Sequence, residues 1–126
     1  MRSIFFALVA APLAFISALQ PSTAYAHAVV IEAQPRVNAA VAAGEVTIRL
    51  RYNSRLDVAR SRLVLTTPGG ATVQLTPQAG AGTDELVAVA QAKAPGGYRV
   101  RWQVLTLDGH LTRGDIPFRV VASASN

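Results

Sequence analysis

Apolar and polar residues alternate along much of the chain after residue 26, with the two-residue period that indicates β-strands. The segment 98–106 shows the alternation most strongly, because Tyr98, Val100, Trp102 and Val104 fall on one face of the expected strand. A helical period is hard to find in the same region. The alternation predicts strands at 28–33, 45–52, 62–66, 71–75, 86–92 and 98–106, and a last strand that directs Ile116, Phe118 and Val120 inward.

Turn sequences separate these strands. The segments 68–70 and 95–97 both read Pro-Gly-Gly, a composition typical of tight turns. About seven short strands joined by turns predict an all-β fold, an immunoglobulin-like antiparallel β-sandwich or barrel with Greek-key connections. Trp102 is in phase with the apolar face, so we interpret it as a core residue between two sheets.

The first 26 residues have a different composition from the rest. Arg2 is their only charged residue, an apolar stretch runs from Ile4 to Leu19, and Ala24-Tyr25-Ala26 has the form of a small-residue cleavage site. This is the layout of a secretory signal peptide, and the apolar stretch is shorter than the ~20 residues of a spanning helix. We therefore expect a signal peptide at 1–26 cleaved after Ala26, one domain at 27–126, and a periplasmic protein.

Composition and charge narrow the chemistry. The 126 residues include no cysteine, so neither disulfides nor thiolate ligands are available. The net charge of +5 is compatible with attraction to nucleic acid or anionic lipid. The arginines, however, are spread along the domain without a dense basic run or an RNA-binding signature. We interpret these arginines as part of a solvated surface, and some of them could shape encounters with a charged partner. We expect no nucleic-acid partner.

The sequence Asp108-Gly109-His110 follows the most strongly alternating strand. Residues two apart in an extended segment point to the same side, so Asp108 and His110 can aim at one point. The motif is weak by itself, because Asp-Gly is a common turn pair. Cleavage after Ala26 would add an N-terminal His27, whose α-amine and ring nitrogen can chelate one ion. Three nitrogens and one oxygen favour Cu(II) or Ni(II) over Cu(I), although zinc accepts such ligands too.

Several residues of the chain match the pattern of a known family: Ala26-His27-Ala28, Pro35, the run 97–102, Asp108-Gly109-His110, Gly114 and Phe118-Arg119-Val120. On these residues, the chain from residue 26 onward resembles the CopC family of periplasmic copper-resistance proteins. This resemblance implies an immunoglobulin-like sandwich and one Cu(II) ion per mature chain, bound by an N-terminal His with the Asp and second His of a D-x-H motif. These ligands map onto His27, Asp108 and His110.

Two departures from the family pattern bear on the site. Some members carry a methionine-rich loop that binds Cu(I), but the only methionine here is Met1, so we expect no methionine-based Cu(I) site. The family also often has an acidic residue after an aromatic-Ser pair near the Cu(II) site. This chain reads Tyr52-Asn53-Ser54 there, so we expect support for the terminal amine to come from elsewhere.

The favoured interpretation is a monomeric Cu(II)-binding protein, not an enzyme, that sequesters copper or exchanges it with an inner-membrane copper transporter. A histidine-brace copper oxidoreductase is one alternative, since an N-terminal His with a second His resembles that site. The small domain and the carboxylate ligand favour a carrier over such an enzyme. A structural β-domain in which both histidines are incidental is the other alternative.

Overall fold

A computed structural model describes residues 28–123 of the protein. In this range the chain forms nine strands, and it contains no helix that is long and apolar enough to cross a membrane. The expected signal peptide at 1–26 and the candidate ligand His27 lie outside the described residues. The strands are β1 (Val30–Gln34), β2 (Ala40–Ala42), β3 (Gly44–Tyr52), β4 (Leu56–Thr66), β5 (Thr72–Leu75), β6 (Gln78–Ala79), β7 (Glu85–Ala92), β8 (Gly96–Thr106) and β9 (Leu111–Val121).

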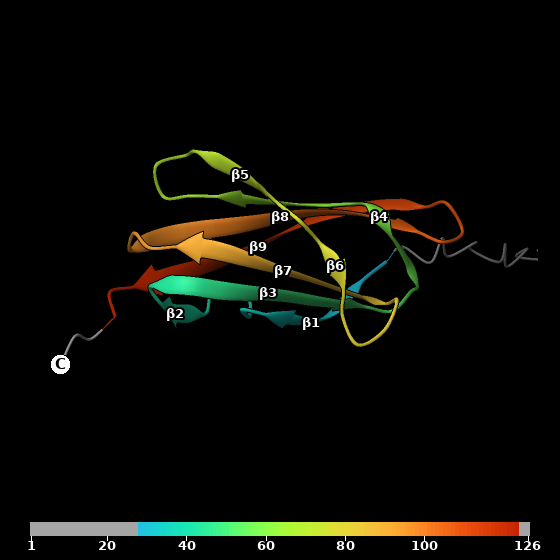
Figure 1. Ribbon diagram of the computed structural model, residues 1–126, viewed down its shortest axis with the longest axis horizontal. Coiled ribbons are helices and arrows are strands. Elements are labelled where there is room, and N and C mark those ends of the chain that lie inside the picture. The colour runs from blue at the N-terminus through green and yellow to red at the C-terminus, as the bar shows by residue number, and fades with distance from the viewer. Residues whose placement is uncertain (1–27, 124–126) are drawn as a thin grey trace, which may run out of the picture.

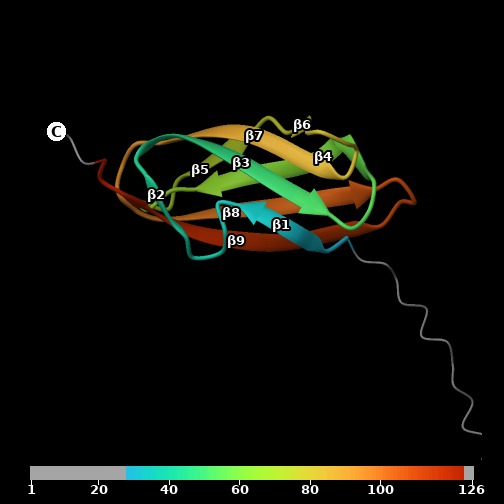
Figure 2. The ribbon, with the colours of Figure 1, turned by 90° about the horizontal axis from the view of Figure 1, so that it is seen from below.

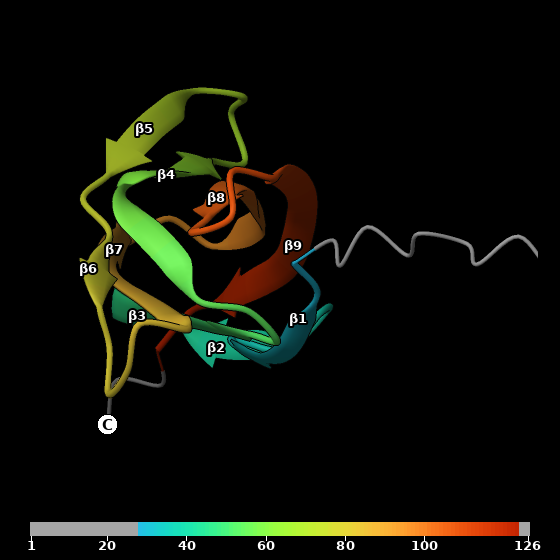
Figure 3. The same cartoon turned by 90° about the vertical axis from the view of Figure 1, so that its right-hand side faces the viewer.

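The strands form two sheets that lie face to face (Figure 1). The first sheet has the order β1-β3-β7-β6, and the second has the order β2-β9-β8-β4-β5. All of these pairs are antiparallel except β2 with β9, which run parallel. The chain changes sheet on both sides of β2, between β3 and β4, between β5 and β6, and between β7 and β8. Figure 3 shows the two layers from one end. The predicted immunoglobulin-like sandwich is confirmed.

The core lies between the two sheets and is built from the alternate residues of the long strands. On β8 the predicted inward set of Tyr98, Val100, Trp102 and Val104 is buried, with at most 7% of any of these residues exposed. The Trp102 ring meets the Tyr52 ring edge-on, with ring centroids 5.2 Å apart. This edge-to-face contact is a favoured arrangement of buried aromatic rings. The interpretation of Trp102 as a core residue is therefore confirmed.

The strands are longer and more numerous than the alternation indicated. β4 begins at Leu56, well before the expected start at Arg62. A register shift between Asp57 and Arg62 interrupts its pairing with β8, and a bulge of this kind also breaks the two-residue period in the sequence. The strands β2 and β6 are only 3 and 2 residues long, too short to show any period.

Candidate metal site

Asp108 and His110 lie in the turn that joins β8 to β9. β8 ends at Thr106 and β9 begins at Leu111. Between the two candidate ligands, Gly109 has a φ of +90°, a backbone conformation that costs glycine little. The Gly109 N–H donates to the Thr106 carbonyl oxygen at 2.9 Å, and the Thr106 N–H donates to the His110 carbonyl oxygen at 2.9 Å. These bonds fix a tight turn with one candidate ligand on each side of the glycine.

The side chains of Asp108 and His110 are adjacent. Asp108 Oδ1 lies 3.1 Å from His110 Nδ1. The two side chains are 62% and 39% exposed, respectively, whereas the His110 Nδ1 atom itself is buried. The turn therefore brings together one carboxylate oxygen and one imidazole nitrogen on side chains that are both partly exposed to solvent.

Thr106 supports this pair from the buried side of the turn. Thr106 is buried, and its hydroxyl donates a short hydrogen bond to Asp108 Oδ1. The same hydroxyl oxygen accepts a hydrogen bond from the His110 backbone N–H at 3.0 Å. One buried hydroxyl thus positions both candidate ligands, a role that sequence reasoning missed. The sequence did contain a sign of this role, because Thr106 is a polar residue at a position of β8 that the alternation directs inward, two residues before Asp108.

The electrostatics of the turn keep Asp108 ionised. The hydrogen bond from the Thr106 hydroxyl, and after it the hydrogen bond from His110, hold the pKa of the Asp108 carboxyl below its ordinary value. Both contacts act in this direction because they stabilise the carboxylate over the neutral acid. Asp108 therefore offers an anionic oxygen at neutral pH without first losing a proton.

The described chain enters the sandwich at the same end as this turn (Figure 1 and Figure 2). Ala28 is buried in the core, and the Val29 N–H donates to Asn53 Oδ1 at 2.8 Å. The Asn53 N–H donates in return to the Val29 carbonyl oxygen at 3.1 Å. Two residues further on, the Arg55 carbonyl oxygen accepts a hydrogen bond from the Leu107 N–H at 3.1 Å. The short segment 53–55 thus connects the entering chain to the β8–β9 turn.

Asn53 is a second contributor that sequence reasoning passed over. The segment Tyr52-Asn53-Ser54 lacks the acidic residue that is common in the family, so we expected support for the terminal amine to come from elsewhere. The Asn53 side chain nevertheless holds the backbone of Val29. An amide oxygen accepts a hydrogen bond from a backbone N–H as a carboxylate oxygen does, so Asn53 anchors the entering chain without a negative charge.

The described residues include two of the three candidate ligands. Asp108 and His110 are brought together, whereas His27 lies outside the range that the structure describes. Within residues 28–123, no three His, Asp or Glu side chains gather into a group that could hold a metal ion. Among the described residues, Asp108 and His110 are therefore a pair of candidate ligands and not a group of three.

The fold and this turn together define the class of the protein: a β-sandwich domain that presents a carboxylate and an imidazole on one hairpin. The chain belongs to the CopC family, since the family model of the CopC domain matches residues 30–121. The match runs from the first strand to the last.

Known proteins similar to this chain include both sequences and solved structures. Protein YobA of Escherichia coli (strain K12) is 31% identical over 107 residues, which cover 82% of this chain and 86% of YobA. CopC from Methylosinus trichosporium OB3b superposes with a TM-score of 0.71 at 27% identity, covering 79% of this chain and 99% of that one. PcoC from Escherichia coli, a methionine-rich copper resistance protein, gives a TM-score of 0.61 at 27% identity, covering 76% and 100%. The resemblance stated from the sequence is confirmed.

Proposed function

We propose that the exported protein binds one Cu(II) ion, as cargo, through His27, Asp108 and His110. The observation that carries this proposal is the 3.1 Å separation between Asp108 Oδ1 and His110 Nδ1. Two ligand atoms that are each about 2.0 Å from one ion, at right angles, lie about 2.8 Å apart. Cu(II) prefers a tetragonal arrangement built from such neighbouring ligands. The β8–β9 turn is therefore suited to supply two of the four positions around the ion.

His27 would supply the other two positions. Signal-peptide cleavage after Ala26 would leave His27 with a free α-amine beside its imidazole, and the two groups can close one chelate ring. The next residue, Ala28, is buried in the core. The described chain enters the sandwich at the end that carries the turn. The hydrogen bonds between Val29 and Asn53 fix the direction in which the chain enters. This anchoring supports a ligand at position 27, because that position directly precedes residues whose backbone is held close to the turn.

The chemistry of the available donors favours Cu(II) over Cu(I). Cu(I) selects thiolate and thioether ligands, and the chain contains no cysteine and no methionine other than Met1. PcoC is a methionine-rich copper resistance protein, and this chain shares its fold without that composition. We infer that this chain, which has the same fold, binds copper through nitrogen and oxygen ligands alone.

The proposed role is that of a carrier or buffer. The protein would act as a monomer in the periplasm, where it sequesters copper or exchanges it with an inner-membrane copper transporter. The partial exposure of the Asp108 and His110 side chains supports exchange, because a partner can approach the turn from solvent. We propose no catalytic step.

Calorimetry combined with EPR spectroscopy tests this function. A chain that begins at His27 is titrated with Cu(II), and we expect one tightly bound ion with the EPR signature of three nitrogens and one oxygen. Replacing His110→Ala should remove one nitrogen from that signature. The matched control Asp115→Ala removes a carboxylate from the same hairpin, away from the turn, and should leave the spectrum unchanged.

A one-residue N-terminal extension tests the amine separately. The extension keeps every side chain but moves the α-amine away from His27, so we expect it to weaken copper binding as much as the loss of a side-chain ligand. Equal binding by the extended and native chains would remove the amine from the site. Sustained peroxide production by the copper-loaded protein with a reductant would contradict a carrier role.

A further inference from the structure

The outer face of the second sheet is lined with arginine side chains. On β8, Arg99 and Arg101 are exposed and alternate with buried residues. On β9, Arg119 is exposed between two buried residues, and Arg113 is exposed on the same side of the strand. Arg62 of β4 belongs to the same face. Neighbouring strands in a sheet lie about 4.8 Å apart, so side chains from three adjacent strands form one continuous surface.

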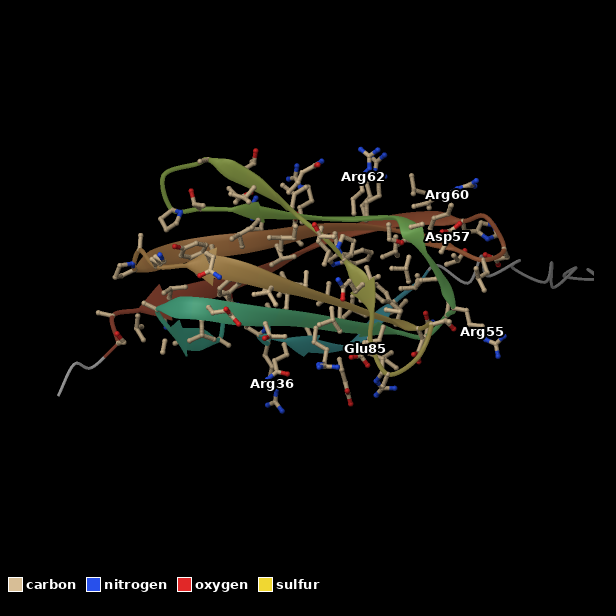
Figure 4. All side chains as sticks on the ribbon, in the orientation of Figure 1. Arg36, Arg55, Asp57, Arg60, Arg62 and Glu85 are labelled. Atoms are coloured by element: carbon tan, nitrogen blue, oxygen red, sulfur yellow. The ribbon has the colours of Figure 1, made fainter. Side chains whose placement is uncertain are left out.

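The strand register places these side chains in adjacent rows. Arg62 of β4 and Arg113 of β9 stand on the two sides of Gln103 of β8. Arg60 extends the row along β4, with a side chain that is 76% exposed. Figure 4 shows Arg60 and Arg62 on one side of the sandwich, whereas Arg36 points away from the opposite side.

This arginine face accounts for the whole net charge of the described domain. Its six arginines are accompanied by two aspartates, Asp57 at 3.7 Å from Arg60 and Asp115 at 3.2 Å from Arg101. Four positive charges therefore remain in excess on the face. In the rest of the described range, five basic residues are matched by five acidic ones: Arg36, Arg49, Arg51, Arg55 and Lys93 against Glu32, Glu45, Asp84, Glu85 and Asp108.

A hollow at one end of the arginine face is suited to an anion. Its lining includes two basic residues, Arg99 and Arg119, together with the polar residues Thr66, Thr67 and Asn38. None of the described residues that line it carries a carboxylate. Guanidinium groups bind phosphate oxygens with two hydrogen bonds at once, and hydroxyl groups can donate further bonds.

The other end of the face carries exposed leucines beside the candidate metal site. Leu105 and Leu111 are partners in the β8–β9 register. Leu111 is 47% exposed, and Leu107, in the turn itself, is 61% exposed. Apolar side chains next to a basic surface are typical of proteins that lie on a membrane, where the apolar groups enter the boundary between headgroups and acyl chains.

We propose that the arginine face docks on a bilayer that contains anionic phospholipid. Headgroup phosphates would bind at Arg99 and Arg119, and the leucines of the β8–β9 hairpin would contact the lipid interface. A nucleic acid would supply phosphates but would leave these leucines in water. The excess positive charge is also spread over a broad surface of three strands. Such a surface is complementary to the extended layer of phosphates on a bilayer. Docking would bring the Asp108–His110 turn to the membrane surface.

Vesicle sedimentation tests the proposal. The chain that begins at His27 contains all nine strands and is used without metal, so the outcome does not depend on copper binding. We expect it to sediment with vesicles that contain phosphatidylglycerol and not with vesicles of phosphatidylcholine alone, and to be released by salt. Each basic residue close to an anionic membrane strengthens binding about fivefold, so Arg99→Gln with Arg119→Gln should weaken binding roughly 25-fold.

A matched double variant separates a docking face from nonspecific attraction. Arg36→Gln with Arg55→Gln removes the same charge from outside the arginine face, and we expect binding close to that of the native chain. Equal weakening by the two double variants would overturn the proposal. It would also be overturned by a lack of sedimentation with phosphatidylglycerol, including a result in which inorganic phosphate binds at Arg99 and Arg119 while vesicles do not.

The orientation on the membrane provides an independent readout. The chain has no cysteine, so one spin label can be attached at a single introduced site. A label at Val64→Cys lies on the arginine face, and a label at Thr47→Cys lies on the outer face of the first sheet. We expect only the first label to lose access to a water-soluble relaxation agent when vesicles are added. Protection of the second label alone, or of neither, would overturn the proposed face.

Discussion

Gly114 lies directly opposite Trp102 in the register between β9 and β8, and the indole ring occupies the space that a side chain at position 114 would need. A Cβ atom on Gly114 would lie 2.8 Å from Trp102 Nε1 and closer still to the ring carbons. The Trp102 residue is 7% exposed and cannot move aside without disturbing its contact with Tyr52. The absence of a side chain on β9 is therefore what admits the large ring on β8.

The substitution Gly114→Ala should destabilise the domain by about 1–3 kcal/mol, the usual cost of forcing extra volume into a well-packed core. Urea unfolding, followed by the fluorescence of the single tryptophan, measures this change. Gly97→Ala is the matched control, because a Cβ atom at that position would meet no atom within 4 Å. Equal midpoints for the two variants would contradict the close contact with Trp102.

Tyr52 and Tyr98 are both buried, yet their hydroxyl groups differ. The Tyr98 hydroxyl donates to the Ala94 carbonyl oxygen at 2.7 Å, whereas the Tyr52 hydroxyl has no hydrogen-bond partner among the described residues. Burial also raises the pKa of the Tyr52 hydroxyl well above its ordinary value. We expect Tyr98→Phe to cost about 1 kcal/mol of unfolding free energy and Tyr52→Phe to be neutral or stabilising. Denaturant midpoints measure the stability of both variants. A Tyr52→Phe protein that is less stable than the Tyr98→Phe protein would contradict this difference between the two hydroxyl groups.

The alternation of apolar residues was sufficient to predict the sandwich because each long strand has one face in the core. The inward positions of β8 illustrate this, since Val100 and Val104 are fully buried. The alternation could not predict the first half of β4, where the register shift after Asp57 puts exposed residues next to each other. It also could not give the order of strands in each sheet, because that order depends on contacts between segments far apart in the sequence.

The same limit explains what was missed on the surface and at the metal site. Arg62, Arg99 and Arg119 are far apart in the sequence and were interpreted as a dispersed, solvated set. Only the pairing of β4, β8 and β9 places them on one face. The Asp108–His110 pair could be predicted because two residues in a short turn need no distant contact. The support from Thr106 depends on the detailed geometry of that turn.

The substitution Thr106→Val tests whether the buried hydroxyl holds the turn. Its loss removes the first cause of the lowered Asp108 pKa, so we expect the pKa of that carboxyl to rise, as measured by NMR titration of the metal-free protein. A lowered pKa stabilises the folded state above the ordinary value of ~3.9, and this contribution is lost as pH falls through the folded pKa. In the variant, less of this stability should therefore be present at neutral pH.

Thr112→Val is the control for that experiment. The Thr112 hydroxyl is buried and has no hydrogen-bond partner among the described residues, so its removal should not lower stability. It should also leave the Asp108 titration unchanged. Thr106→Val should in addition cost about 1 kcal/mol, because the His110 N–H loses its acceptor. A Thr106→Val protein with an unchanged Asp108 pKa would show that the hydroxyl does not control the carboxyl.

The pH dependence of copper binding distinguishes the proposed ligands. An α-amine titrates near ~7.7 and an imidazole near ~6.5, and each must lose its proton to bind copper, so affinity should fall as pH drops. The Asp108 carboxyl adds nothing to this fall above pH ~4, because its pKa lies below the ordinary value. Below pH ~6 the logarithm of the association constant should therefore change by about three per pH unit for the chain that begins at His27, and by about two after an N-terminal extension. Isothermal titrations across this range measure both slopes, and equal slopes would exclude the α-amine as a ligand.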